Sequence, residues 1–162
     1  MDSIKNEIED LCDIRIDKDG TWYYRGAEMY RTDIVNYLYG HLKKDSEGGY
    51  YIEMSDDDRC KIDVEDTAFV VRSAERVRSQ KKEEETIKIY LSDGSMEVLC
   101  LDSLSISNEN VLYCRIKGNE FKARFARKSY YQIIKDVEYD EEFRKYFLRM
   151  NGNRFFIEES KN

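Results

Sequence analysis

The stretch Arg59–Val71 constrains the fold most, because its hydrophobic pattern changes halfway along. The first part alternates apolar and polar residues, which predicts a strand with one buried face. Its apolar members are Cys60, Ile62 and Val64. The second part, Ala68–Val71, is continuously apolar, which is typical of a strand covered on both faces. Glu65 and Asp66 lie between the two parts, so the pattern predicts two lobes that meet at a pair of carboxylates.

We therefore predict an α+β chain with an N-terminal lobe over residues 1–65 and a C-terminal lobe over residues 66–162. The charge is divided unevenly between them. Residues 1–66 hold 9 Lys/Arg and 18 Asp/Glu, whereas residues 67–162 hold 18 and 16. Most of these charges are expected on solvated faces. The net charge of -7 argues against a protein that coats DNA or RNA generally.

The N-terminal lobe is expected to combine short strands with two helices. We expect a helix over 3–12, strands over 14–17 and 21–25, a helix from Thr32 or Asp33 to Leu42, and a strand over 50–53. The C-terminal lobe reads as a run of strands joined by short turns. Its expected strands are 67–77, 86–91, 95–101, 111–116 and 120–125, followed by a helix around 130–137, a helix near 140–149 and a last strand over 154–158. Short connections favour antiparallel neighbours, so this lobe should be a curved β-meander closed by a helix.

The two lobes also resemble each other in sequence order. In each, a hairpin leads through an arginine, Arg31 or Arg127, into a helix and then to a strand that ends in Ile-Glu. We interpret this as an internal duplication. The alternative is that hairpin–helix–strand is simply a common unit.

Cysteine usage and hydropathy indicate a cytoplasmic protein with no membrane segment. The four cysteines form no C-x-x-C pair and no zinc spacing. Cys12, Cys60 and Cys114 lie beside apolar positions, so we expect free buried thiols. The first residues are polar, and no apolar run approaches the ~18–20 residues of a membrane-spanning helix.

A series of motifs resembles the bacterial family DUF1285. They are Asp19-Gly20-Thr21-Trp22, Arg31 before a helix, Val64-Glu65-Asp66-Thr67-Ala68-Phe69, and the basic run from Arg115 to Lys128 with Tyr130-Tyr131. The resemblance extends from about Asp13 to Ile157. It implies two repeats of a related fold, of which the second is superficially similar to pleckstrin-homology domains. It also implies a binding site between the lobes for a nucleotide-like or nucleic-acid-based ligand, and a role in signal transduction.

The sequence departs from the family pattern at two places. Met54 to Asp58 replace the usual Thr-Pro-x-Glu turn, and Ala68 replaces a proline before Phe69. Both departures put the local backbone geometry in question. The additional acidic residues of the first departure would also weaken the binding of an anion.

Six basic residues lie within fourteen positions of the C-terminal lobe. They are Arg115, Lys117, Lys122, Arg124, Arg127 and Lys128. Arginine binds phosphate or carboxylate with two parallel hydrogen bonds, so a phosphate-bearing ligand is a reasonable hypothesis for Arg115, Arg124 and Arg127. The alternatives are a solvated sheet face, favoured for the three lysines, and ion pairs with Glu65 and Asp66.

Other candidate sites are weaker. Glu65 and Asp66 could form a general acid–base pair, but ion pairing or backbone hydrogen bonds are the favoured interpretation. Asp56-Asp57-Asp58 does not follow the spacing of a calcium loop, and His41 has no nucleophile near it in sequence. Trp22 or Tyr24 would be the exposed member of an aromatic trio able to stack on a base. We therefore predict no metal site, no cofactor and no catalytic site.

The leading hypothesis is a non-enzymatic, ligand-binding regulatory protein that takes an anionic ligand between its lobes. Its predicted site residues are Arg31, Glu65, Asp66, Arg115, Arg124 and Arg127. The alternative is a protein-interaction module of the pleckstrin-homology type, acting through a sheet edge or its C-terminal helix. The sequence does not determine the oligomeric state.

Overall fold

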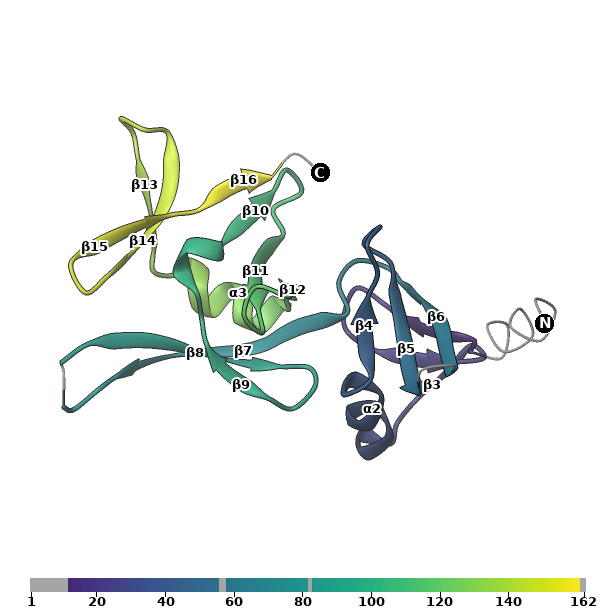
Figure 1. Cartoon of the computed structure of the whole chain (residues 1–162). Helices are drawn as coiled ribbons and strands as arrows, with labels where there is room; N and C mark the ends of the chain where they lie inside the picture. Colours follow the sequence, from purple (N-terminus) through teal and green to yellow (C-terminus); the bar gives the residue numbers. More distant parts are fainter. Residues whose placement is uncertain (1–11, 56–57, 82, 161–162) are drawn as a thin grey trace. The chain divides into compact units, whose positions relative to one another are not determined.

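The computed structural model describes residues 12–55, 58–81 and 83–160. The chain divides into two compact units, Met1–Ala68 and Phe69–Asn162, which are described separately below (Figure 1). Within the described residues, no helix is long and apolar enough to cross a membrane. The helix expected over residues 3–12 lies outside the described residues except for Cys12.

The N-terminal unit is built on one six-stranded sheet, in the order β3-β2-β1-β6-β5-β4. Its elements are β1 (Ile14–Ile16), β2 (Trp22–Tyr24), β3 (Ala27–Glu28), α2 (Thr32–Tyr39), β4 (Leu42–Lys44), β5 (Tyr50–Ser55) and β6 (Asp58–Val64). The first strand lies at the centre, antiparallel to β2 and parallel to β6. The sequence predicts β1, β2, β5 and the alternating strand β6, but not β3 or β4.

The turn between β1 and β2 is fixed by local chemistry. Gly20 adopts a φ of 83°, which favours glycine. The Asp17 carboxylate accepts the backbone N–H groups of Asp19 and Thr21 at 2.9 and 3.0 Å, and Tyr23 donates its hydroxyl to the other oxygen of the same carboxylate at 3.0 Å. The Asp-Gly signal in the sequence thus encodes a tight turn.

The helix α2 begins and ends differently from the prediction. Arg31, rather than Thr32 or Asp33, is the residue that precedes the helix, and no side chain caps its first turn. The helix ends at Tyr39 instead of continuing to Leu42, because Leu42 starts β4 and pairs with Ile52. Pairing buries Leu42 in the core, and this tertiary contact outweighs the helical spacing.

Trp22 belongs to the core of this unit and is not an exposed stacking residue. Its side chain is 2% exposed, and its ring lies 4.8 Å from that of Tyr39 in an edge-on arrangement. Tyr39 in turn donates its hydroxyl to the carbonyl of Ala68 at 2.9 Å. Of the two residues expected as the exposed member of the aromatic trio, Tyr24 is confirmed, with 42% of its surface exposed, and Trp22 is wrong.

Two of the three cysteines expected as free thiols form a disulfide, Cys12–Cys60. The prediction was wrong because 48 positions separate them, a spacing that corresponds to no motif. The sheet pairs β1 with β6, which brings Cys12, just before β1, close to Cys60 on β6. The Cα atoms of the two cysteines lie 5.5 Å apart, within the range that a disulfide spans. Cys114 is a free buried thiol, as expected, and Cys100 is free and exposed.

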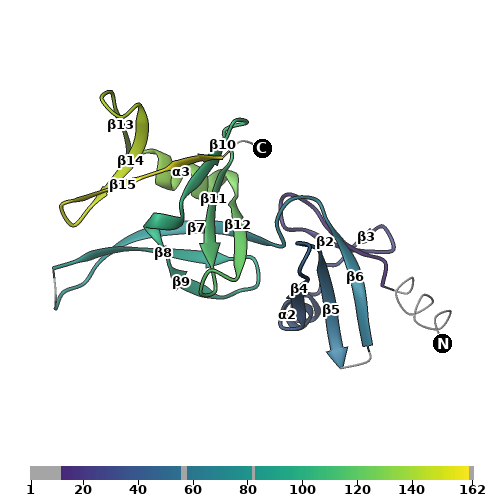
Figure 2. The same ribbon diagram turned by 45° about the horizontal axis from the view of Figure 1, so that its top comes forward.

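The C-terminal unit contains a seven-stranded sheet in the order β16-β10-β11-β12-β7-β8-β9 and a separate three-stranded sheet, β13-β14-β15. The elements of the larger sheet are β7 (Phe69–Arg78), β8 (Glu85–Leu91), β9 (Met96–Val98), β10 (Ser105–Ser107), β11 (Leu112–Ile116), β12 (Phe121–Phe125) and β16 (Glu158–Ser160). A short helix η1 (Leu101–Ser103) precedes β10. Figure 2 shows β10, β11 and β12 running side by side.

The sheet is not the single meander that the short turns predicted. Strands β7, β8 and β9 form one antiparallel run, and β10, β11 and β12 form another. The two runs join through a parallel pairing of β12 with β7, and β16 pairs parallel with β10. Turn lengths report only on neighbours in sequence, so they could not reveal these two pairings between distant segments.

The helix α3 (Arg127–Ile134) follows β12 and packs on β7. The buried hydroxyl of Ser129 donates to the carbonyl of Val71 at 2.5 Å, and the side-chain carbonyl of Gln132 accepts the N–H of Ala74 at 2.7 Å. The expected helix therefore exists, but it starts three residues before Tyr130 and ends before Val137.

The helix predicted near 140–149 is wrong, because this segment belongs to a three-stranded antiparallel sheet. Its strands are β13 (Val137–Asp140), β14 (Lys145–Met150) and β15 (Asn153–Phe156). The Asp140 carboxylate accepts the N–H of Phe143 at 2.9 Å, and Arg144 adopts a φ of 55°, so the chain reverses where a helix would continue. Phe147 and Phe156 then face each other across β14 and β15.

The core of the N-terminal unit depends on the Tyr39 hydroxyl. We expect Tyr39→Phe to lower the free energy of unfolding by about 1–2 kcal/mol, because it leaves a buried carbonyl without its donor. Trp22 is the only tryptophan, so its fluorescence during urea unfolding reports on this unit. The matched control is Tyr37→Phe on the same helix, where the side chain is 57% exposed and no effect is expected. Equal midpoints for the two variants would contradict this assignment.

The tip of the β14–β15 hairpin is held by Asn151, whose side chain accepts the N–H of Glu85 at 2.8 Å and donates to its carbonyl at 2.9 Å. Asn151 has a φ of 51°, so Asn151→Gly preserves the backbone and removes only these bonds. We expect hydrogen exchange at the Glu85 amide to accelerate about fivefold, the effect of losing roughly 1 kcal/mol. Asn119→Gly, in another turn with a φ of 72°, should leave that amide unchanged. Unaltered exchange in Asn151→Gly would refute the contact.

Candidate ligand-binding surface

The β11–β12 hairpin places three cations on one face of the large sheet. The turn between the strands contains Lys117, Gly118 and Asn119, all with positive φ. This turn sets Arg115 directly opposite Lys122, and Tyr113 opposite Arg124. Residues two apart on a strand share a face, so these four side chains form one surface, which we call the basic face.

The basic face combines one exposed and two half-buried cations with the ring of Tyr113. Lys122 holds its ammonium nitrogen 4.1 Å from the centre of the Tyr113 ring, a cation–π arrangement. The Arg115 side chain is exposed, and its backbone N–H donates to the Ser103 hydroxyl at 3.0 Å, which ties β11 to η1. In the part of the chain that the structure describes, no carboxylate forms an ion pair with Arg115 or Lys122.

The predicted site residues omit Lys122 and Tyr113. The sequence contained a signal for Lys122, because the tight turn at residues 117–119 already pairs it with Arg115. The turn does not identify Tyr113 as a site residue, because its part in the site is the contact of its ring with the Lys122 ammonium. Lys117 and Arg115 both belong to the basic run, but their environments differ.

Lys117 is engaged in the protein itself. Its ammonium lies 2.9 Å from the Asp93 carboxylate, and its backbone N–H donates to the Glu97 carboxylate at 3.1 Å. Burial acts to raise the pKa of Asp93, but hydrogen bonds from Ser95 and the charge of Lys117 outweigh it and lower the pKa overall. Lys117 thus joins two hairpins, which supports the structural interpretation of this residue.

Arg127 is the first residue of α3 and is exposed. It lies beyond the end of β12, so it does not belong to the row of side chains on the basic face. Arg124 is half-buried on that row.

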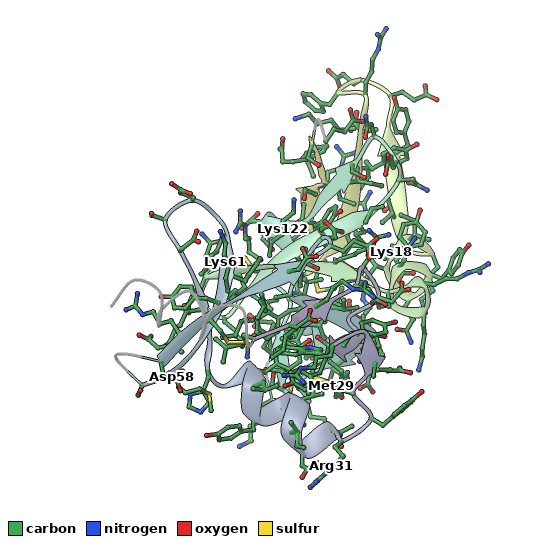
Figure 3. The ribbon with its side chains drawn as sticks, turned by 90° about the vertical axis from the view of Figure 1, so that its right-hand side faces the viewer. Lys18, Met29, Arg31, Asp58, Lys61 and Lys122 are labelled. Carbon is green, nitrogen blue, oxygen red and sulfur yellow. A yellow bond between two sulfur atoms is a disulfide. The ribbon has the colours of Figure 1, made fainter. Side chains whose placement is uncertain are left out.

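In the N-terminal unit, Arg31 and Glu65 serve separate local structures. Arg31 forms an ion pair of 2.7 Å with Asp33, and this partner lowers the pKa of the Asp33 carboxyl. Glu65 instead accepts the backbone N–H of Lys18 at 2.9 Å, while its own N–H donates to Ile16. Figure 3 shows Arg31 pointing outward at the start of α2, well away from Lys18 within this unit. The structure therefore does not bring Arg31 and Glu65 together.

These bonds favour the structural interpretation of Glu65, because its carboxylate attaches the end of β6 to the turn after β1. Asp66 is half-buried beside it and also interacts with the protein. Within the described residues, no group of three or more His, Cys, Asp or Glu side chains is arranged to hold a metal ion.

A second group of arginines lines a groove of about 370 Å³ near the β14–β15 turn. Arg76 is already committed there, because it pairs with Glu85 at 3.0 Å and with Asp136 at 3.5 Å, and it donates to the carbonyl of Arg149. Arg149 pairs with Glu138. This groove is therefore largely neutralised, and the basic face is the stronger candidate for an anion.

Cys114 is not a nucleophile at neutral pH. Burial, with a smaller contribution from Glu97, raises the pKa of its thiol to about 12. We expect iodoacetamide at pH 8 to modify one cysteine in the native oxidised chain, the exposed Cys100. Unfolding without reductant should add Cys114, and reduction should add Cys12 and Cys60. Intact-mass spectrometry counts each step, and three modified thiols in the native chain would disprove the disulfide.

Comparison with known proteins places the chain beside one family. Residues 3–67 match the family model described as Domain of unknown function (DUF1285), N-terminal domain. The crystal structure of a DUF1285 family protein from Silicibacter pomeroyi DSS-3 superposes with a TM-score of 0.71 at 22% identity, covering 90% of this chain and 79% of that one. One from Shewanella baltica OS155 gives a TM-score of 0.59 at 15% identity, covering 75% and 90%. No curated protein matches the sequence.

Proposed function

We propose that this chain is a non-enzymatic regulatory protein that binds a phosphate-bearing, nucleotide-like ligand on its basic face. Its resemblance to the DUF1285 family is confirmed by the comparisons above. The observation that carries the proposal is the cross-strand pair of Arg115 and Lys122. Neither side chain has an ion-pair partner among the described residues, and Arg124 lies on the same face.

The geometry of the pair suits a phosphate group. Residues directly opposite on antiparallel strands have Cβ atoms about 5 Å apart, so both side chains reach one anion. Arginine supplies a planar fork for two phosphate oxygens, and lysine supplies a compact charge. The Lys122 side chain lies over the Tyr113 ring, and this contact restricts its conformations before a ligand binds. Lys122 therefore loses less conformational entropy on binding.

The whole chain has a net charge of -7, so the basic face is a local feature. Electrostatic attraction would therefore select small anions at this position instead of long nucleic acids. Arg127 and the predicted site residues of the N-terminal unit, Arg31, Glu65 and Asp66, remain predictions.

The internal duplication and the likeness to pleckstrin-homology folds also remain proposals. Supporting the first, both units have an α-helix between two strands among their described residues, as in β3-α2-β4 and β12-α3-β13. Supporting the second, α3 packs on β7 of an antiparallel-rich sheet. A cytoplasmic location is a further proposal. Trapping free thiols in living cells would test it. Because reducing compartments keep thiols reduced, a cytoplasmic location predicts that Cys12 and Cys60 are trapped as free thiols.

The proposal predicts that a nucleotide or cyclic dinucleotide raises the melting temperature of the chain, because a ligand that binds only the folded state stabilises it. For the nucleotide that does so, isothermal titration calorimetry should show affinity falling about 10- to 100-fold in Arg115→Ala and in Lys122→Ala, the loss of one charge-assisted hydrogen bond each. Affinity should also fall with added salt.

Lys135→Ala is the matched control, because Lys135 is exposed at the far end of α3 and its substitution removes the same charge. This variant should bind like the unmodified chain. The proposal fails if no nucleotide stabilises the protein. It also fails if the affinities of Arg115→Ala and Lys122→Ala equal that of the control.

One observation, at the β9 edge of the large sheet, favours the alternative of a protein-interaction module. Strand β9 is the edge strand, and Met96 and Val98 on it are 47% and 55% exposed beside Tyr90. The partner would be an extended peptide with alternating apolar residues, which adds a strand to this edge. Pull-down of such a peptide, abolished by Met96→Lys while nucleotide titrations stay blank, would replace the anion proposal with this one.

A further inference from the structure

The C-terminal unit contains a second cavity, of about 410 Å³, that the basic face does not use. It is formed by the strands β10, β14 and β16 and by the turn that connects β10 to β11. Its lining includes Ser107, Asn108, Asn110, Tyr146, Glu159 and Ser160. A cavity of this size falls within the range of small-molecule sites, roughly 300–1,000 Å³.

The walls of this cavity are fixed by the protein's own hydrogen bonds. The Ser107 hydroxyl accepts the N–H of Val111 at 3.1 Å, and the backbones of Ser107 and Asn110 close the turn at 2.9 Å. Asn110, with a φ of 66°, donates its side-chain amide to the Tyr130 hydroxyl at 2.8 Å. The turn is therefore held in one conformation before any ligand arrives.

Two polar groups at the cavity remain unused. Among the residues that the structure describes, neither the Asn108 amide nor the Glu159 carboxylate has a hydrogen-bond or ion-pair partner. Glu159 pairs in register with Ile106 on the adjacent strand, so the ladder between β10 and β16 fixes its backbone. An amide offers both donors and an acceptor, and a carboxylate offers acceptors only.

Tyr146 adds a flat apolar surface to these polar groups. Its side chain is 44% exposed, and its ring lies 4.9 Å from that of Tyr139 on the paired strand. Its backbone carbonyl accepts the N–H of Ile157 at 2.8 Å, which holds β14 next to the start of β16. An aromatic ring of this kind packs against the apolar face of a ring-shaped ligand.

We propose that this cavity binds a neutral sugar ring that carries a vicinal diol. The ring packs on Tyr146, the Glu159 carboxylate accepts hydrogen bonds from the two adjacent hydroxyls, and the Asn108 amide bonds a third polar group. The lone carboxylate disfavours anionic ligands by repulsion, so this site differs in ligand class from the basic face. The proposal is independent of the proposed nucleotide site.

The test uses the full chain and a defined panel of neutral ligands. The panel contains glucose, galactose, maltose, adenosine and uridine, with 2′-deoxyadenosine and 2′-deoxyuridine as analogues that lack the diol. Saturation-transfer NMR should detect binding of diol-bearing members but not of the deoxy analogues. The hexoses and the nucleosides distinguish a free sugar from the ribose of a nucleoside as the source of the ring. For the bound member, Glu159→Gln and Tyr146→Ala should each raise Kd at least about tenfold, the effect of one lost hydrogen bond to a charged group or one lost ring contact.

Two control variants test whether these losses are specific to the cavity. Glu109→Gln removes the same charge next to Asn108, outside the cavity lining, and should leave Kd unchanged. Lys135→Ala, at the end of α3 and outside the cavity lining, should also leave it unchanged. The inference is overturned if no panel member binds, if deoxy analogues bind equally well, or if Glu159→Gln and Tyr146→Ala both bind as Glu109→Gln does.

Discussion

The burial of β7 is the constraint on which the rest of the C-terminal unit depends. Phe69, Val70 and Val71 are 0–1% exposed, so every polar group of this backbone needs a partner inside the protein. The Ser92 hydroxyl accepts the N–H of Val70. The carbonyl of Val71 accepts both the Ser129 hydroxyl and the N–H of Ala126. These bonds fix the start of α3 and, through the pairing of β12 with β7, the register of the β11–β12 hairpin.

The basic face follows from that register. Because Ala123 and Phe125 are buried on one face of β12, Lys122 and Arg124 must point to the opposite face, since side chains alternate along a strand. The hairpin turn then sets Arg115 beside Lys122. A shift of one residue would bury these cations, so the same core contacts that stabilise the sheet also position the charges. The proposed anion site is therefore on the strand that pairs with the buried start of β7.

Local patterns predicted much of the fold. The alternation at Cys60, Ile62 and Val64 predicted β6, the continuous run at Phe69 predicted the buried strand, and Asp-Gly turns marked hairpins at Gly20 and Gly94. The errors arose where a local pattern served two structures equally well. Phe143, Tyr146 and Phe147 have helical spacing, yet Tyr146 and Phe147 lie on opposite faces of a strand. The side chain of Asp140 and the left-handed backbone of Arg144 decided between the two.

By itself, the sequence determined most of the elements, the concentration of positive charge between Arg115 and Lys128, and the buried character of β7, because each of these depends on residues adjacent in the chain. Only the tertiary structure decided which of those charges stand together. Lys117 forms an ion pair with Asp93, a contact between two hairpins, whereas Arg115 and Lys122 have no ion-pair partner among the described residues. It also decided the Cys12–Cys60 bond and the cavity beside Tyr146, since both join segments that no spacing rule connects. The physical reason is that strand pairing between distant segments is set by the packing of the whole core, and local patterns do not contain that information.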